Sequence, residues 1–287
     1  MKRKHINYQV VPDPKFRRFM AAAFRSVQHT PMIHGLIEID VTKARGFLRD
    51  NKARTGESLS FTAFLIACLA KAIDEHKAVQ AFRLGSKRLI LFEDVDVYTL
   101  INRDVDGQEL PITYIIRAAN RKTVREIHHE IRAAQVQEVE KDLKWLQVLP
   151  DFIFRLFFWV FSLIGRRYPQ VWKKYVGTVG ITAVGMFGKG TGWAIPPALP
   201  TLTLTVGGIG EKPVLVDGHI ALRDYLSLTI SFDHDIIDGA PAARFTTRLK
   251  ELIEGGYGLF DSTIEPVPAG TEGGSKQQMD ATRHALP

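Results

Sequence analysis

Apolar residues recur along the chain with two periods, one typical of helices and one typical of half-buried strands. Residues 15–27 carry apolar side chains at helical spacing, at Phe16, Phe19, Met20 and Phe24. Soon afterwards Ile37, Ile39 and Val41 alternate with acidic residues. A period near 3.6 predicts an amphipathic helix, and a period of two predicts a strand with one buried face. We therefore expect a helix followed by a strand.

Three further segments have helical patterns. Residues 42–55 are short and charged, with Thr42 as the expected N-cap, and residues 123–146 form a charged amphipathic pattern. Residues 61–76 are apolar almost all round and follow Ser60. Serine is a preferred N-cap residue, and a helix without a polar face is buried. We expect this helix to lie inside the core.

Strand patterns separated by turn residues fill most of the remaining chain. Asp106-Gly107 predicts a two-residue hairpin turn, and residues 202–233 contain at least one further hairpin. A last helix begins near Pro241, which suits a first helical turn. Strands and helices mix without a regular βαβ alternation. The pattern favours an α/β fold, an α+β two-layer sandwich of a mixed sheet with flanking helices, over a doubly wound nucleotide-binding fold.

Residues 152–164, "FIFRLFFWVFSLI", are apolar except for Arg155 and Ser162. As a helix they would be about 20 Å long, which is too short for a bilayer core of roughly 30 Å. We therefore exclude a membrane span. Two interpretations stay open: burial against the domain or a neighbouring subunit, which we favour, and a peripheral helix at a membrane interface through residues 152–174.

These patterns divide the chain into three parts. Residues 1–13 form an N-terminal extended arm, and residues 14–260 form the main domain, with an apolar helical insertion at about 145–175. Residues 261–287 are rich in Gly, Pro, Ser, Thr and Gln, and we expect this C-terminal tail to be disordered.

Composition and charge narrow the class of protein. The 287 residues are 45% apolar, which suits a globular protein, and the net charge of +7 favours anionic ligands without selecting one. Cys68 is the only cysteine, so an internal disulfide is excluded and a cytoplasmic location is expected. The basic N-terminus has no following apolar segment and is no secretory signal. Nucleic-acid binding is not expected, because no such motif accompanies the charge.

The stretch "SFDHDIIDGAPAARF", residues 231–245, holds the strongest candidate chemistry. His234 follows a strongly apolar strand and precedes a turn and a helix. It could be a metal ligand, a core histidine or a general base. We expect no metal, because neighbouring carboxylates alone do not make a zinc set, and the adjacent His128 and His129 should point apart on their helix. A histidine at the end of a rigid strand suits proton transfer near neutral pH.

The same stretch resembles the His-x-x-x-Asp-Gly signature of the 2-oxo-acid dehydrogenase acyltransferases, the dihydrolipoyl acyltransferase catalytic domains that share the chloramphenicol acetyltransferase fold. His234, Asp238 and Gly239 match the signature. "GTVGITAVGMFG" is similar to the family's strand and glycine turn, and the resemblance continues over roughly residues 14–260.

The resemblance implies a mechanism and its site residues. His234 would remove the thiol proton of coenzyme A or dihydrolipoamide, and the thiolate would attack a thioester. Thr182 stands where the family has a serine whose hydroxyl stabilises the oxyanion, and Ala183 stands where asparagine is common. Asp238 would position His234, while Gly239 and Gly185 would shape the backbone nearby.

The family also implies a homotrimer with active sites between subunits, with His234 from one subunit and Thr182 from the next. The expected partners are a lipoyl domain on another polypeptide and dehydrogenase subunits, and coenzyme A is the expected acyl carrier. Two alternatives remain: a catalytically reduced scaffold subunit, and an acetyl-CoA-dependent O-acetyltransferase of a small hydroxyl compound. Metal is not implied.

Overall fold

The computed structural model describes residues 9–13, 15–27, 30–105, 108–136, 150–184, 190–197 and 201–260. The predicted tail 261–287, the hairpin turn Asp106-Gly107 and most of the predicted arm 1–13 lie outside these residues.

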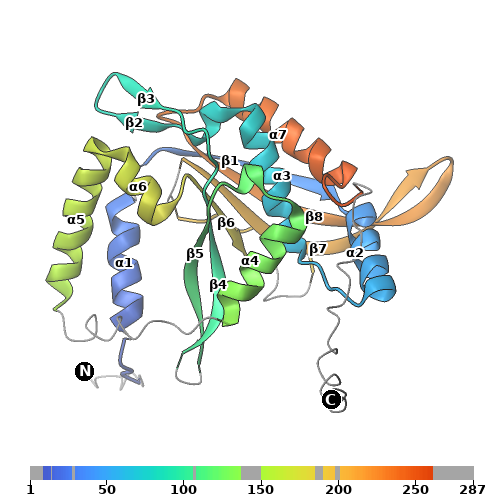
Figure 1. Cartoon of the computed structure of the whole chain (residues 1–287), viewed down its shortest axis with the longest axis horizontal. Coiled ribbons are helices and arrows are strands. Elements are labelled where there is room, and N and C mark those ends of the chain that lie inside the picture. The colour runs from blue at the N-terminus through green and yellow to red at the C-terminus, as the bar shows by residue number, and fades with distance from the viewer. Residues whose placement is uncertain are drawn as a thin grey trace, which may run out of the picture.

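A six-stranded mixed sheet forms the centre of the molecule (Figure 1). Its order is β1-β8-β7-β6-β4-β5, with β6 parallel to both of its neighbours and every other pairing antiparallel. The short strands β2 and β3 form a separate hairpin. The strands are β1 (Met32–Asp40), β2 (Phe82–Leu84), β3 (Arg88–Ile90), β4 (Val97–Val105), β5 (Gln108–Ile116), β6 (Val179–Ala183), β7 (Leu202–Val216) and β8 (His219–Asp233).

Helices α3, α4 and α7 cover one face of the sheet, so the predicted two-layer α/β class is confirmed (Figure 1). The core lies between these layers and includes Phe64, Phe245 and Phe232, all with 2% or less of their surface exposed. The helices are α1 (Lys15–Val27), α2 (Thr42–Thr55), α3 (Phe61–Glu75), α4 (Val124–Val136), α5 (Asp151–Arg167), α6 (Pro169–Val176) and α7 (Gly239–Gly255), with short 3-10 turns at Lys77–Gln80 and Ala119–Arg121.

Two N-cap predictions had opposite outcomes. The Ser60 hydroxyl accepts a hydrogen bond from the Ala63 N–H, so this cap is confirmed. The cap prediction for Thr42 is wrong, because Thr42 is the first helical residue and its hydroxyl accepts from the distant Asp224 N–H at 2.8 Å. A tertiary contact with β8 has taken the oxygen that a local cap would use.

Helices α1, α5 and α6 form a separate group beside the sheet (Figure 1). Phe154 and Gly165 on α5 are buried, whereas Phe152, Trp159 and Leu163 are exposed. Burial of this insertion within the chain is therefore confined to one face of α5. Among the described residues, no helix is both long and apolar enough to cross a membrane.

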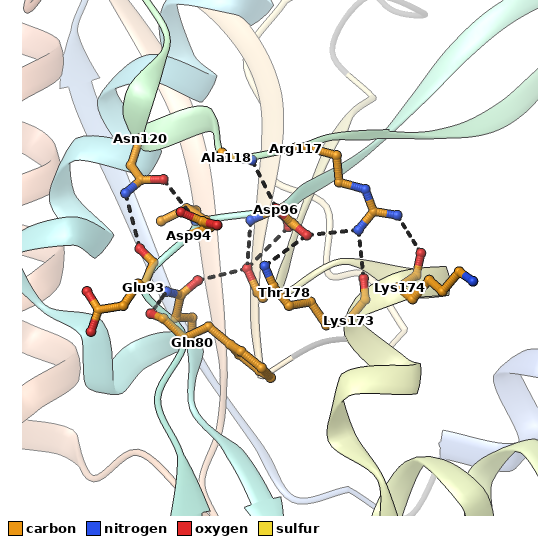
Figure 2. Close-up of polar contacts among 12 residues, drawn as sticks. Gln80, Glu93, Asp94, Asp96, Arg117, Ala118, Asn120, Lys173, Lys174 and Thr178 are labelled. Carbon is orange, nitrogen blue, oxygen red and sulfur yellow. Dashed lines mark hydrogen bonds and ion pairs between the residues drawn. The ribbon is translucent and has the colours of Figure 1, made fainter.

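The buried carboxylate of Asp96 joins this helical group to the sheet (Figure 2). It accepts hydrogen bonds from Arg117 Nη1 at 2.8 Å and from the Ala118 N–H at 2.9 Å, and it lies 3.1 Å from the Nζ of Lys173 on α6. The Asp96 N–H donates to the hydroxyl of Thr178, the residue before β6, at 3.0 Å. One residue thus connects β4, α6 and the start of β6.

The surroundings of Asp96 favour its charged form. Burial is the largest single influence and would by itself raise the pKa of the carboxyl group. The Ala118 N–H and the cations Arg117 and Lys173 together outweigh it, so the pKa of Asp96 is lowered from 3.8. Since the folded pKa lies below the unfolded value, this charge stabilises the fold above about pH 4 and the contribution is lost as the pH falls further.

We predict that Asp96→Asn lowers the free energy of unfolding by about 3 kcal/mol at pH 7, because it leaves two cations without their shared buried partner. Urea denaturation measures the difference. Glu93→Gln is the control, since the Glu93 side chain is 76% exposed and its ion pair with Lys77 at the surface should contribute little to stability. A gap between wild type and Asp96→Asn that stays constant down to about pH 2 would contradict the assignment.

Candidate active site

His234 is the first residue after β8, as its position behind an apolar strand predicted. Its N–H donates to the Pro31 carbonyl at 2.8 Å, which holds the backbone beside the start of β1. The imidazole side chain is 44% exposed. A fixed backbone with an accessible ring is the arrangement that a proton-transfer group needs.

Asp238 precedes α7 and lies four residues after His234. Its Oδ1 is 3.8 Å from His234 Nδ1, which is within range of an ion pair but beyond a hydrogen bond. The Asp238 side chain is 87% exposed, and it makes no capping hydrogen bond to α7. The structure therefore brings Asp238 and His234 together without enclosing either of them.

The turn between β8 and α7 is held by its own backbone. The Asp233 carbonyl accepts from the N–H groups of Ile236 and Ile237, and its carboxylate accepts from the Asp235 N–H at 2.9 Å. Arg83 on β2 donates to the Asp235 carbonyl at 2.5 Å. Burial raises the pKa of Asp233, and the nearby Asp235 carboxylate adds to that effect. These contacts fix the path of the chain on both sides of His234.

Thr182 lies on β6, on the sheet face opposite the helix layer. Its register partner on β7 is Thr205, whose own partner on β8 is Thr229. The neighbouring hydroxyl residues on this face are Thr203, Ser227 and Ser231. Five of these six residues, all but Thr182, are buried, although they point away from the aliphatic core.

The hydroxyl groups of Thr203, Thr205 and Thr229 have no hydrogen-bond partner within the described part of the chain. Leaving such a buried group unpaired costs about 1–3 kcal/mol. Ser231 is paired, because its hydroxyl lies 2.8 Å from Nδ1 of His34 on β1. We call this set of hydroxyls on β6, β7 and β8 the hydroxyl face. Except for Thr182, its members are enclosed within the protein.

We did not identify the hydroxyl face or His34 from the sequence. The signal was present, since "TLTLT" at 201–205 and "SLTIS" at 227–231 alternate hydroxyl and aliphatic residues. Alternation of this kind predicts two different strand faces, but it does not say which strands pair.

Within one chain the structure does not bring Thr182 and His234 together. Thr182 is level with Thr229, while His234 is five residues further along β8 and two strands across. Strand dimensions then separate the two residues by roughly 20 Å. Of the two glycines, Gly239 begins α7, whereas Gly185 lies outside the described residues.

The other reactive side chains considered from the sequence, Cys68 and the pair His128 and His129, have structural roles. Cys68 is fully buried in α3, and burial raises the pKa of its thiol far above the usual range, which makes it unreactive. The expectation that His128 and His129 point apart is wrong. Both converge on Glu57, and one ligand atom from each of the three lies within 4.8 Å of the others.

The donor set of this cluster does not fit a metal ion. His128 Nδ1 accepts a hydrogen bond from the Ser60 N–H at 3.1 Å, so Nδ1 is occupied and Nε2 carries the proton. Glu57 already pairs with Arg125 at 3.0 Å. Burial is the main cause that lowers the pKa of His128, which is consistent with a neutral ring. The cluster supports the start of α3.

Comparison with known proteins places the chain among acyltransferase domains. Residues 6–148 and 175–260 match the family model described as 2-oxoacid dehydrogenases acyltransferase (catalytic domain). The lipoamide acyltransferase component of the branched-chain alpha-keto acid dehydrogenase complex of Bacillus subtilis is 26% identical over 250 residues, which cover 85% of this chain and 52% of the relative. The chain thus spans about half the length of the curated relatives it matches.

Two solved structures share the fold. The truncated catalytic core of the 2-oxoacid dehydrogenase multienzyme complex from Thermoplasma acidophilum has a TM-score of 0.62 and 23% identity, with 87% of this chain and 100% of that chain covered. Azotobacter vinelandii dihydrolipoamide acetyltransferase has a TM-score of 0.64 and 22% identity, with 88% and 93% covered. Its catalytic mechanism has been investigated at a serine, a histidine fifty-two positions later and an asparagine four positions beyond that.

We predict that added Zn²⁺ does not raise the melting temperature of the protein, because the Ser60 N–H already occupies His128 Nδ1. Thermal unfolding with and without zinc measures this, and His129→Ala serves as the matched control that lacks one candidate ligand. A zinc-dependent rise in melting temperature that His129→Ala abolishes would show that the cluster binds metal.

Proposed function

Because the chain belongs to the 2-oxoacid dehydrogenases acyltransferase (catalytic domain) family, we propose that it transfers acyl groups between the thiols of coenzyme A and dihydrolipoamide. The observation that carries the proposal is the position of His234, exposed at the end of β8 with Asp238 beside it. The names of the matched relatives, which are acyltransferase components of dehydrogenase complexes, support the same chemistry.

The spacing of three residues supports their proposed roles. Thr182, His234 and Asp238 are separated by fifty-two and four positions, as are the serine, histidine and asparagine of the Azotobacter vinelandii enzyme. Thr182 keeps the hydroxyl of that serine, and Asp238 keeps the side-chain oxygen of that asparagine, with a second oxygen in place of its amide NH2 group. We assign Thr182 as an oxyanion donor and Asp238 as a positioning residue.

In the proposed reaction, Nε2 of His234 takes the proton of an incoming thiol, while Nδ1 faces Asp238. The thiolate sulfur attacks the carbonyl carbon of the thioester, and the carbonyl electron pair moves to oxygen. The Thr182 hydroxyl donates a hydrogen bond to that oxyanion. The intermediate then expels the second thiolate, which recovers the proton from the imidazolium, so the base is regenerated.

The roughly 20 Å between Thr182 and His234 within one chain supports a site formed by two subunits, and we propose a homotrimer on this basis. The exposure of His234 and Asp238 in the single chain is consistent with a neighbouring subunit covering them. A catalytic base of this kind works best where water is excluded.

We propose a thioester of coenzyme A as one substrate, since the chain belongs to this acyltransferase family. A dihydrolipoyl group supplies the other thiol. Dehydrogenase subunits are the proposed further partners.

We predict that His234→Ala lowers kcat/KM for acetyl transfer from acetyl-CoA to dihydrolipoamide by a factor of about 10³, because it removes the proposed base that takes the thiol proton. A coupled thiol assay measures the rate. His219→Ala is the matched control, since His219 is an exposed histidine at the far end of β8. Near-normal turnover by folded His234→Ala would refute the proposed base.

We predict that two inactive variants restore activity when they assemble together. Thr182→Val removes the oxyanion donor and should cost about 10²–10³ in kcat, whereas Thr182→Ser should stay active. If each site uses His234 from one subunit and Thr182 from the next, random co-assembly of His234→Ala with Thr182→Val rebuilds about a quarter of the sites. Assay of the co-refolded mixture tests this. Activity no higher than the mean of the separate variants would contradict a shared site.

A further inference from the structure

We propose that α5, together with α6 and α1, docks the protein on the surface of an anionic lipid bilayer. The docking surface consists of exposed apolar side chains on α5, which we call the aromatic ridge: Phe152, Leu156, Phe157, Trp159, Leu163 and Ile164. This inference concerns a face that takes no part in the proposed acyl transfer.

The aromatic ridge inverts the normal pattern of a surface helix. Phe152, Leu156, Trp159 and Leu163 follow one another at spacings of four, three and four residues, so they lie on one side of α5. They are 66%, 55%, 59% and 46% exposed. A surface helix of a globular protein normally exposes polar residues on this side. A contiguous apolar face of this size indicates a binding surface.

The ridge is held in place by contacts on the opposite side of α5. Phe161 stacks on Trp172 of α6 with ring centroids 5.2 Å apart. A Cβ at Gly165 would come within 2.7 Å of the same indole ring, so the two helices pack as closely as glycine allows. Figure 1 shows α1 and α5 side by side at the edge of the molecule, away from the helix layer that covers the sheet.

The positive charge around the ridge indicates an anionic partner. Helices α1, α5 and α6 contain nine Lys and Arg residues and one acidic residue, Asp151. The whole chain has a net charge of +7, so the rest of the protein carries one more negative than positive charge. Arg17, Arg25, Arg167 and Lys174 are exposed in this region. An apolar helix face flanked by cations is typical of proteins that bind anionic membrane surfaces.

Other occupants fit less well. A second copy of the chain placed on this face would bring two groups of cations together with only Asp151 of each copy to offset them, which is unfavourable. The family model leaves out residues 149–174, so α5 lies outside the ranges shared with the family. α5 is seventeen residues long and packs against α1 and α6, which suits an interfacial position.

Flotation of the full chain with vesicles tests the proposal. Wild-type protein should float with phosphatidylcholine vesicles that contain about one third phosphatidylglycerol and stay behind with pure phosphatidylcholine. Trp159→Ser/Leu163→Ser should reduce binding at least about tenfold, because it removes two exposed apolar side chains. Leu215→Ser/Ile220→Ser is the matched control and should bind as wild type, since those apolar side chains are even more exposed but lie on the β7–β8 hairpin.

A charge-reversal pair separates electrostatic attraction from apolar burial. Arg167→Glu/Lys174→Glu should lower binding about tenfold, whereas Lys87→Glu/Arg88→Glu on the exposed β2–β3 hairpin should not. Acyl-transfer activity in free solution should be unchanged in all four double variants. That readout separates failure of this proposal from failure of the proposed function.

The proposal is overturned if wild-type protein does not float with the anionic vesicles, or if Trp159→Ser/Leu163→Ser binds them as well as wild type does. Light scattering covers the remaining alternative. Suppose that wild-type protein does not bind the vesicles and that Trp159→Ser/Leu163→Ser reduces the mass of the assembly. The ridge then joins copies of the chain, and the lipid assignment is wrong.

Discussion

Strand β8 meets two different environments on its two faces, and most of the structure depends on that constraint. Leu228, Ile230 and Phe232 pack under the helix layer, while Thr229 and Ser231 belong to the hydroxyl face. A slip of one residue in the pairing with β1 or β7 would put hydroxyls into the aliphatic core and aliphatic groups onto the other face. The register is therefore locked, and it determines where His234 leaves the sheet.

The same register separates the two halves of the proposed site. Because Thr182 pairs with Thr205 and Thr205 with Thr229, the oxyanion donor lies far down the sheet from the end of β8. A six-stranded sheet backed by a packed core cannot bend to close roughly 20 Å. Under the proposed function, catalysis requires assembly, since each site takes one half from each of two subunits and is covered where they meet.

Several close contacts join the α5–α6 insertion to the central sheet. Arg117 donates to the carbonyls of Lys173 and Lys174 at the end of α6 as well as to Asp96 (Figure 2). Gly177 follows with φ +80°, and a Cβ there would lie 2.7 Å from the Asp96 carbonyl oxygen. The chain then enters β6, which carries Thr182. α6 therefore leads directly into the strand that holds a proposed catalytic residue.

Local patterns alone determined much of this protein. The buried α3 with its Ser60 cap, the alternating β1, and His234 at the end of an apolar strand were all predicted, because period and capping are properties of neighbouring residues. The resemblance of residues 231–245 to a family signature added the roles of the site residues. Tertiary structure decided the rest. The hydroxyl of Thr42 was taken by a distant N–H of β8, and His128 and His129 converged on Glu57 from another element. The hydroxyl face and the distance between Thr182 and His234 follow from strand pairing. Pairing joins residues that are far apart along the chain, and no local period encodes it.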